Sequence, residues 1–187
     1  ADKPDSGKIK VNGKEVKINS PLDAMKLGMA YLPEDRKAEG IIADLSVREN
    51  IIIAMQAKKG MFHPMSRKEM EEAADKYIDM LQIKTASRET PIKSLSGGNQ
   101  QKVIIGRWLL TNPDYLILDE PTNHLDIAAI EWLENYVKHY PFAVVLVSHD
   151  RMFLDHVVDE IVEIEFGKTQ RLSLIHISEP TRPRLIS

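Results

Sequence analysis

The chain has 187 residues, of which 43% are hydrophobic and 28% are charged, so it can bury one ordinary hydrophobic core. A formal net charge of -3 gives no general attraction to nucleic acid or to anionic membranes. The absence of cysteine excludes disulfides and thiolate metal sites, and no apolar run approaches the ~20 residues that a membrane helix needs. We therefore expect a cytoplasmic protein without a membrane span of its own.

The N-terminal part of the chain predicts a hairpin, a short helix and a strand. Residues 7–18 alternate polar and apolar side chains around an Asn-Gly pair, which is typical of a two-residue hairpin turn because both turn residues accept positive φ. Residues 20–28 are typical of a short helix that Ser20 caps and a glycine ends. The apolar residues 29–33 then predict a strand.

Helical and strand patterns alternate in the rest of the chain. Residues 66–83 begin with capping-box spacing and continue with apolar residues at helical spacing, and residues 100–110 and 127–140 are also helical in pattern. The apolar runs 115–120 and 142–150 are typical of strands that are buried on both faces. This alternation predicts an α/β fold with a parallel sheet.

A glycine pair lies where a loop enters one of these helices. Ser96, Gly97 and Gly98 come just before the helical pattern of residues 100–110. Free backbone N–H groups and the positive end of a helix can meet an anion there, and glycine lets phosphate oxygens approach closely. The same residues also suit a glycine-rich helix entry that binds nothing, so the rest of the chain decides the interpretation.

Two predicted strands end in polar side chains. Asp119 and Glu120 end the first, at the edge where open α/β sheets bind ligands. Asp119 is suited to hold Mg²⁺, and Glu120 to orient or deprotonate a water that attacks a γ-phosphate. His149 follows the second strand, from which its imidazole can reach the same phosphate. An acidic turn and a structural histidine are the alternatives, but the combination with the glycine pair favours a phosphate site.

Together these motifs resemble those of the ATP-binding cassette (ABC) ATPases. "LSGGNQQK" resembles the signature motif, "YLILDE" the Walker B strand, "NHLD" the D-loop and "SHD" the switch histidine. In that family two cassettes pack head to tail, and ATP lies between the P-loop of one and the signature motif of the other. The resemblance implies ATP and Mg²⁺ as ligands, with Ser96, Gly97, Gly98 and Asn99 beside the nucleotide and Asp126 in communication across the dimer.

The P-loop itself is missing from the sequence. No stretch fits the pattern G-x-x-x-x-G-K-[ST], whose amides and lysine hold the phosphates. In the family the P-loop precedes the segment where this chain starts, so we expect a truncated cassette, a partial P-loop NTPase fold that lacks the P-loop strand. The resemblance implies a second cassette that supplies a P-loop, and we expect negligible hydrolysis by the chain alone.

Residues 1–122 resemble the second cassette of bacterial sugar-import ATPases of the ribose, galactose and xylose type. The similar stretches include "LGMAYLPEDRKAEGI" and "LSGGNQQKVIIGRWL". Glu34 falls where many cassettes carry the Q-loop glutamine, which couples the nucleotide site to the transport subunit. The resemblance implies membrane permease subunits as partners and a position at the inner membrane through them, but it does not reveal the sugar.

The resemblance changes after the peptide "LDEPT". Residues 122–171 resemble the ABC-F proteins, tandem cassettes that act on ribosomes, and residues 158–170 predict a final strand or hairpin. Residues 172–182, "LSLIHISEPTR", resemble a translated sequencing adapter, and we expect residues 172–187 to form a disordered, artefactual tail. Three interpretations stay open: a sugar-import ATPase subunit, a ribosome-associated translation factor, and a non-functional chimera from an assembly error. The truncated nucleotide-binding domain would span residues 1–171.

Overall fold

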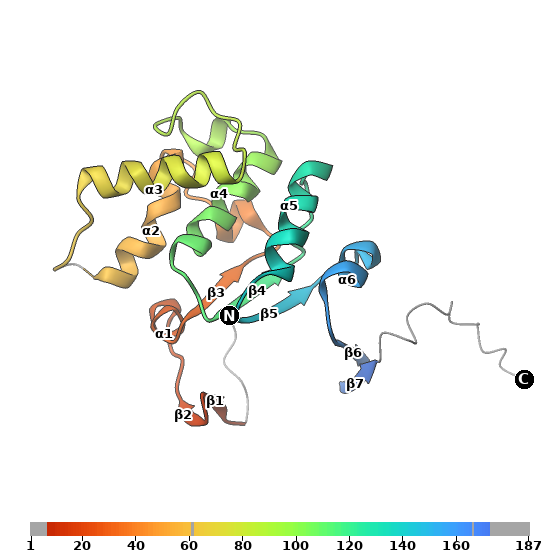
Figure 1. The fold of residues 1–187 in the computed structure, drawn as a ribbon. Coiled ribbons are helices and arrows are strands. Elements are labelled where there is room, and N and C mark those ends of the chain that lie inside the picture. The colour runs from red at the N-terminus through yellow and green to blue at the C-terminus, as the bar shows by residue number, and fades with distance from the viewer. Residues whose placement is uncertain (1–6, 61, 166, 173–187) are drawn as a thin grey trace, which may run out of the picture.

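A computed structural model describes residues 7–60, 62–165 and 167–172 of the chain. Figure 1 shows their arrangement. In chain order the elements are β1 (Ile9–Val11), β2 (Lys14–Val16), α1 (Pro21–Lys26), β3 (Met29–Leu32), the π-helical turn η1 (Arg36–Gly40), α2 (Val47–Lys59), α3 (Arg67–Met80), the 3-10 turn η2 (Ile92–Ser94), α4 (Gly97–Leu110), β4 (Tyr115–Asp119), α5 (Ile127–Lys138), β5 (Ala143–Val147), α6 (Arg151–Val157), β6 (Ile161–Glu165) and β7 (Lys168–Leu172).

The central sheet is parallel, as the alternation of helices and strands predicts. It has the order β3-β4-β5, and the register aligns Tyr31 with Ile117 and Ile117 with Val145. α4 and α5 lie over one face of this sheet (Figure 1). The hydrophobic core lies between that face and the helices, with Leu32 and Leu116 among its fully buried members. The α/β class with a parallel sheet is therefore confirmed.

The expectation that the strands are buried on both faces is wrong. Along β4, buried and half-buried residues alternate, and along β5 exposed and half-buried residues alternate. Val145 and Val147 are 54% and 53% exposed, and Tyr31 on the same face is 43% exposed. The physical reason is that helices cover only one face of this three-stranded sheet within the described residues. The apolar runs reflect strand propensity as well as burial.

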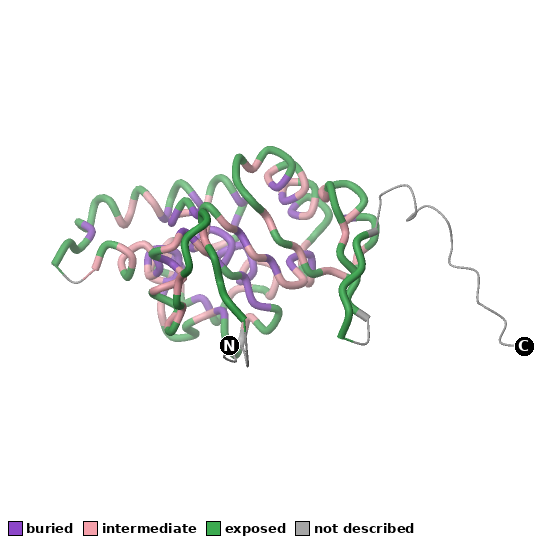
Figure 2. Tube along the Cα trace, turned by 90° about the horizontal axis from the view of Figure 1, so that it is seen from below, coloured by how far each residue is buried: buried purple, intermediate pink, exposed green. Residues whose placement is uncertain are grey.

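Two hairpins extend from the body, and Figure 2 shows most of both as exposed. β1 pairs antiparallel with β2 across Asn12 (φ 51°) and Gly13 (φ 76°), which confirms the predicted two-residue turn with two positive φ values. β6 pairs antiparallel with β7 around Gly167, which confirms the predicted final hairpin. Strand β7 includes Leu172, and the rest of the predicted tail, residues 173–187, lies outside the described residues.

Helices α1 and α3 begin where the sequence predicts. Ser20 accepts a hydrogen bond from the Asp23 backbone as the cap of α1, and Ser66 forms a complete capping box with Glu69 at the start of α3. Sequence analysis did not single out α2 or α6. α2 has a capping box of its own, but its apolar residues run together because the helix packs against both α3 and α4. No helix among the described residues has the length and apolar character needed to cross a membrane.

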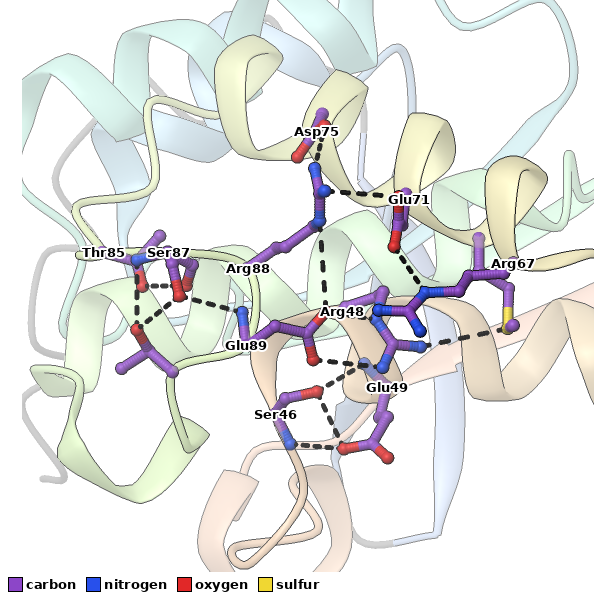
Figure 3. Close-up of polar contacts among 12 residues, drawn as sticks. Ser46, Arg48, Glu49, Arg67, Glu71, Asp75, Thr85, Ser87, Arg88 and Glu89 are labelled. Atoms are coloured by element: carbon purple, nitrogen blue, oxygen red, sulfur yellow. Dashed lines mark hydrogen bonds and ion pairs between the residues drawn. The ribbon is translucent and has the colours of Figure 1, made fainter.

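A surface ion-pair network holds the loop that leads into α4, as Figure 3 shows. Arg48 of α2 donates to both carboxylate oxygens of Glu89, at 2.7 and 3.1 Å. Arg88 of the same loop pairs with Glu71 and Asp75 of α3, at 3.3 and 2.5 Å. Single exposed pairs stabilise a fold by at most about 1 kcal/mol, so we assign this network a role in orienting the loop.

A buried arginine connects α4 to the loop that follows β3. Arg107 donates from Nε to the Asn50 carbonyl at 2.7 Å, from Nη2 to Asn50 Oδ1 at 2.8 Å, and from Nη1 to the Gly40 carbonyl at 2.5 Å. No carboxylate among the described residues forms an ion pair with it. Burial lowers the pKa of Arg107 to about 10, so the guanidinium remains charged at neutral pH.

Asn50 completes this network from α2. Its side-chain amide donates to the carbonyls of Ile42 and Ser46, at 3.1 and 3.0 Å, and its Oδ1 accepts from the Ile42 backbone at 2.9 Å. The residue has no exposed surface. The loss of this side chain would leave the Ile42 N–H without its acceptor and would remove one of the three hydrogen bonds of Arg107, which keeps those to the Asn50 and Gly40 carbonyls.

We expect Asn50→Ala to lower the free energy of unfolding by about 1–3 kcal/mol, because it removes one hydrogen bond of the buried Arg107 and leaves the Ile42 N–H without its acceptor. Urea denaturation would measure the change. Asn19→Ala is the control, because Asn19 is exposed and the change should stay within about 0.5 kcal/mol. Equal midpoints for the two variants would contradict the role of Asn50.

Candidate functional site

The parallel sheet brings four predicted site residues to one edge. Asp119 ends β4 and Glu120 follows it, while Glu34 and His149 each lie two residues beyond the ends of β3 and β5. Because carboxyl ends of parallel strands meet at the same edge, these side chains share one region although the sequence separates them widely. Sequence analysis anticipated this edge for Asp119, Glu120 and His149, and Glu34 joins them there.

Asp119 has a partner that the sequence analysis did not identify. The Tyr31 hydroxyl donates to Asp119 Oδ2 at 3.0 Å, across neighbouring strands on the uncovered face of the sheet. Partial burial, and then the hydrogen bond to Asp119, raise the pKa of the Tyr31 phenol. Tyr31 therefore remains a protonated donor at neutral pH and fixes one carboxylate oxygen of Asp119.

Glu120 is enclosed by the residues after β5. Its carboxylate accepts from the His149 backbone at 3.1 Å and from the Ser148 hydroxyl at 3.3 Å, and it lies 2.9 Å from His149 Nδ1. The carboxylate side chain is 13% exposed, whereas the imidazole is 78% exposed. Glu120 also has φ 45°, a left-handed conformation that is uncommon for a residue with a side chain and often marks a functional site.

The charge of Glu120 acts on His149. The hydrogen bond to Glu120 and its negative charge raise the pKa of the His149 imidazole above its ordinary 6.5, with smaller contributions from Asp150 and Glu34. Because Nδ1 faces Glu120, Nε2 is the ring nitrogen left for another partner. The edge thus presents an imidazole that is protonated more readily than usual, beside a largely buried carboxylate.

The predicted glycine pair begins helix α4, as the sequence suggests. Ser96 is the N-cap residue, but its side chain makes no capping hydrogen bond to the first turn. Its hydroxyl accepts instead from the Asn99 amide at 2.9 Å, and Asn99 Oδ1 accepts from the Lys84 backbone at 2.8 Å. Both ends of the Asn99 amide are therefore used within the chain, and the Ser96 hydroxyl keeps its proton free to donate. A contact between Asn99 and a nucleotide stays a prediction.

Both glycines lie against other parts of the chain. A Cβ at Gly98 would lie 2.5 Å from the carbonyl oxygen of His124, and a Cβ at Gly97 would lie 2.6 Å from Nη2 of Arg36. No side chain fits at Gly98 unless the backbone shifts. Contacts within the chain therefore favour glycine at these positions, in addition to the phosphate contact that the sequence predicts.

Arg36 is a residue of this region that the sequence analysis did not identify. Its guanidinium lies beside Gly97 at the positive end of α4, and its Nε donates to Gln100 Oε1 at 3.4 Å. Gln100 is buried and held in turn by the carbonyls of Ile92 and Leu95, at 3.2 and 3.1 Å. Only the position of Arg36 just after the predicted strand 29–33 could have signalled it, and the pairing with α4 is a tertiary contact.

Asp126 has a structural role in addition to any functional one. Its Oδ1 accepts from the Ala129 backbone at 2.9 Å and caps α5, and its Oδ2 lies 3.8 Å from Nζ of Lys102 on α4. The turn before it contains His124 with φ 66°, a second left-handed residue that is not glycine. Communication across a dimer through Asp126 stays a prediction.

A complete Mg²⁺ site does not form from the described residues. Asp119 supplies a carboxylate oxygen of the kind that Mg²⁺ prefers, but Tyr31 engages one of its two oxygens. The described part of the chain contains no group of three or more acidic, histidine or cysteine side chains that could hold a metal ion. Any Mg²⁺ bound at Asp119 would take its other ligands from water, a nucleotide or another chain segment.

We expect the His149 pKa, measured by NMR titration, to fall toward its ordinary value in Glu120→Gln. The folded pKa is raised, so this contact stabilises the fold fully below pH 6.5 and loses that contribution as pH rises through the folded value. Glu131→Gln removes an exposed carboxylate of α5 and is the control. An identical His149 titration in all three proteins would show that Glu120 does not cause the shift.

The two glycines should differ in their tolerance of alanine. Gly98→Ala should lower the free energy of unfolding by about 1–3 kcal/mol, because a backbone carbonyl blocks the methyl group. Gly97→Ala should cost less than about 1 kcal/mol, because the flexible Arg36 side chain can move and alanine favours the helix. Urea denaturation compares the two, and a larger loss for Gly97→Ala would contradict the assignment.

Comparisons with known proteins agree with the motifs. The sequence model of the family described as "ABC transporter" matches residues 1–123. A fructose import ATP-binding protein of Bifidobacterium longum is 56% identical over 129 residues, which are 69% of this chain and 25% of that protein. A ribose import ATP-binding protein of Bacillus cereus is 38% identical over 167 residues, which are 88% of this chain and 34% of that protein.

The fold has a counterpart among solved structures. The dimeric ATP-binding cassette MJ0796, in a post-hydrolysis state bound to ADP and Pi, superposes with a TM-score of 0.74 at 23% identity, over 91% of this chain and 75% of that one. The chain thus spans about a quarter to a third of the length of the curated relatives it matches. Because the family match covers more than half of the chain, this protein belongs to the ABC transporter family, and its fold is that of the family's ATPase cassette.

Proposed function

We propose that this chain supplies the signature-motif side of an ATP site whose P-loop comes from a second cassette. The observation that carries the proposal is the open start of α4. Within the described residues, no hydrogen bond uses the backbone N–H groups of Gly97, Gly98 or Asn99, and Ser96 makes no side-chain capping bond. Three backbone N–H groups at the open end of the helix and one hydroxyl proton are suited to the terminal phosphate of a nucleotide.

Charge supports the same proposal. The Arg36 guanidinium lies beside the positive end of α4 and forms no ion pair with a carboxylate among the described residues. The guanidinium and the positive end of the helix repel each other, and an anion bound between them would attract both. A triphosphate brought by a P-loop on another molecule would provide that anion.

At the carboxyl edge of the sheet we assign separate roles to Glu120 and His149, as they would act in an intact relative of this chain. Glu120 would orient the attacking water, and the fixed contact with His149 would hold its carboxylate in place. His149 would reach the γ-phosphate through Nε2, since Nδ1 faces Glu120. Its raised pKa favours the imidazolium, which would stabilise the charge on the phosphate oxygens. Asp119 would supply one oxygen to Mg²⁺.

The transport process that we propose is sugar import. Both curated relatives described above carry sugar-import names, and their matches cover 69% and 88% of this chain. We therefore propose membrane permease subunits of a sugar importer as partners, with Glu34 at the coupling position and the chain at the inner membrane through those subunits. The identity of the sugar is a property of other subunits.

The proposed division of the chain at residue 122 lies close to residue 123, where the match to the family model ends. We propose on this basis that residues 122–171 have a different origin, of the ABC-F type. Co-sedimentation of the chain with ribosomes would favour a translation factor, and one long sequencing read across codons 115–187 of the source DNA would detect an assembly error.

The ATP site is tested with a hydrolysis-deficient, P-loop-bearing cassette as the mate. We expect ATP to promote association of the two chains in analytical ultracentrifugation, and Ser96→Ala to weaken this association by about tenfold through loss of a hydrogen bond to a charged group. Ser94→Ala is the control, because its hydroxyl donates to the Pro91 carbonyl away from the start of α4.

Two results would contradict this proposal. Equal association for Ser96→Ala and Ser94→Ala would remove Ser96 from the site. Hydrolysis by the chain without a mate, at about 1 per second or faster, would show that it needs no P-loop from another molecule.

A further inference from the structure

The helix α4 carries a lysine whose amino group is almost enclosed. The side chain of Lys102 is 8% exposed. Its Nζ lies 3.4 Å from the Gln82 carbonyl and 3.8 Å from Asp126 Oδ2. Burying an ammonium group is costly unless it has partners, so these two contacts must offset its loss of hydration. The described residues offer it no closer carboxylate than Asp126.

Lys102 and Gly98 lie four residues apart and therefore share one face of α4. Both meet the same short segment of chain: Gly98 lies against the His124 carbonyl, and Lys102 lies near Asp126. The contacts are of different kinds, one a close approach of backbone and the other an attraction between charges. Together they place two successive turns of α4 against residues 124–126.

Residues 120–126, which α4 contacts in this way, form a strained turn with few hydrogen bonds inside it. The turn from Glu120 to Asp126 contains two left-handed residues, Glu120 and His124, which cost free energy and persist only where the surroundings impose them. Backbone hydrogen bonds within the turn join Asn123 to Glu120 and Leu125 to Thr122, at 3.2 and 3.1 Å. Ser148 and His149 hold Glu120 at the start of the turn, so the part that needs a support from α4 is residues 123–126.

We propose that Lys102 is a positioning residue that, together with the bare backbone of Gly98, fastens the turn 120–126 to α4. The start of α4 and the Glu120–His149 pair are then held in a fixed relation, because both connect to this turn. The carboxylate of Asp126 joins α5 to α4, because its Oδ1 caps α5 and its Oδ2 faces Lys102. The attachment of the turn to α4 does not require a nucleotide. Only its effect on an ATP site rests on the proposed function.

Amide hydrogen exchange of the full chain tests the proposal. The reporting amides are those of Leu125, Ala129 and Ile130, which donate to Thr122 and Asp126. In Lys102→Met, which keeps the aliphatic stem and removes the charge, we expect these amides to exchange about tenfold faster. Reference amides in α2 and α3 should stay within about twofold. Lys102→Arg, which keeps the charge, should restore most of the protection.

Lys68→Met is the matched control, because it removes an exposed lysine of α3 that is 85% exposed. Asp126→Asn gives a second measurement of the same contact: asparagine still caps α5 but loses the charge that faces Lys102. It should speed exchange at Leu125, and it should add nothing further in the Lys102→Met background. If Lys102→Met does not fold, Asp126→Asn alone decides.

The proposal is overturned if Lys102→Met and Asp126→Asn leave exchange at the reporting amides equal to that of Lys68→Met. It is also overturned if Lys102→Met speeds exchange equally in α2, α3 and the turn, because a general loss of stability would then explain the effect. Neither result depends on ATP, so failure here is distinguishable from failure of the proposed nucleotide site.

Discussion

The buried guanidinium of Arg107 is the interaction on which the arrangement of the site depends. It joins α4 to the Gly40 carbonyl and to Asn50 of α2, so the loop after β3 and the helix that follows the glycine pair cannot move independently. Arg36 belongs to the same loop and lies beside Gly97 at the start of α4. A cation without a carboxylate partner among the described residues is stable there because backbone and amide oxygens surround it.

The glycine pair has two explanations that act together. Inside the chain, the His124 carbonyl occupies the space that a side chain at Gly98 would need. Toward solvent, the first N–H groups of α4 and the Ser96 hydroxyl remain available to an anion. Substitution of Gly98 therefore disturbs packing as well as any phosphate contact. Substitution of Ser96 tests the phosphate contact without the clash at His124. The turn that carries Glu120 and Asp126 depends on the inner contact.

Local signals in the sequence predicted local structure well. The Asn12-Gly13 turn, the Ser66 capping box and the acidic pair at the end of β4 follow from residue chemistry over a few positions, and the structure has each of them. One-sided burial of the sheet did not follow, because it depends on which helices cover which face. The contacts of Arg36 and Lys102 join distant segments, and no spacing in the sequence encodes them. The left-handed Glu120 also has no sequence signal.

The start of α4 is proposed to bind a triphosphate that is held by the P-loop of another molecule. NMR of the labelled chain, titrated with ATP in the presence and absence of a P-loop-bearing mate, tests it most directly. We expect saturable shifts of the Gly97, Gly98 and Asn99 amides that require both ATP and the mate. Unchanged amides at these positions, while ATP binds the mate and the two chains associate, would contradict it.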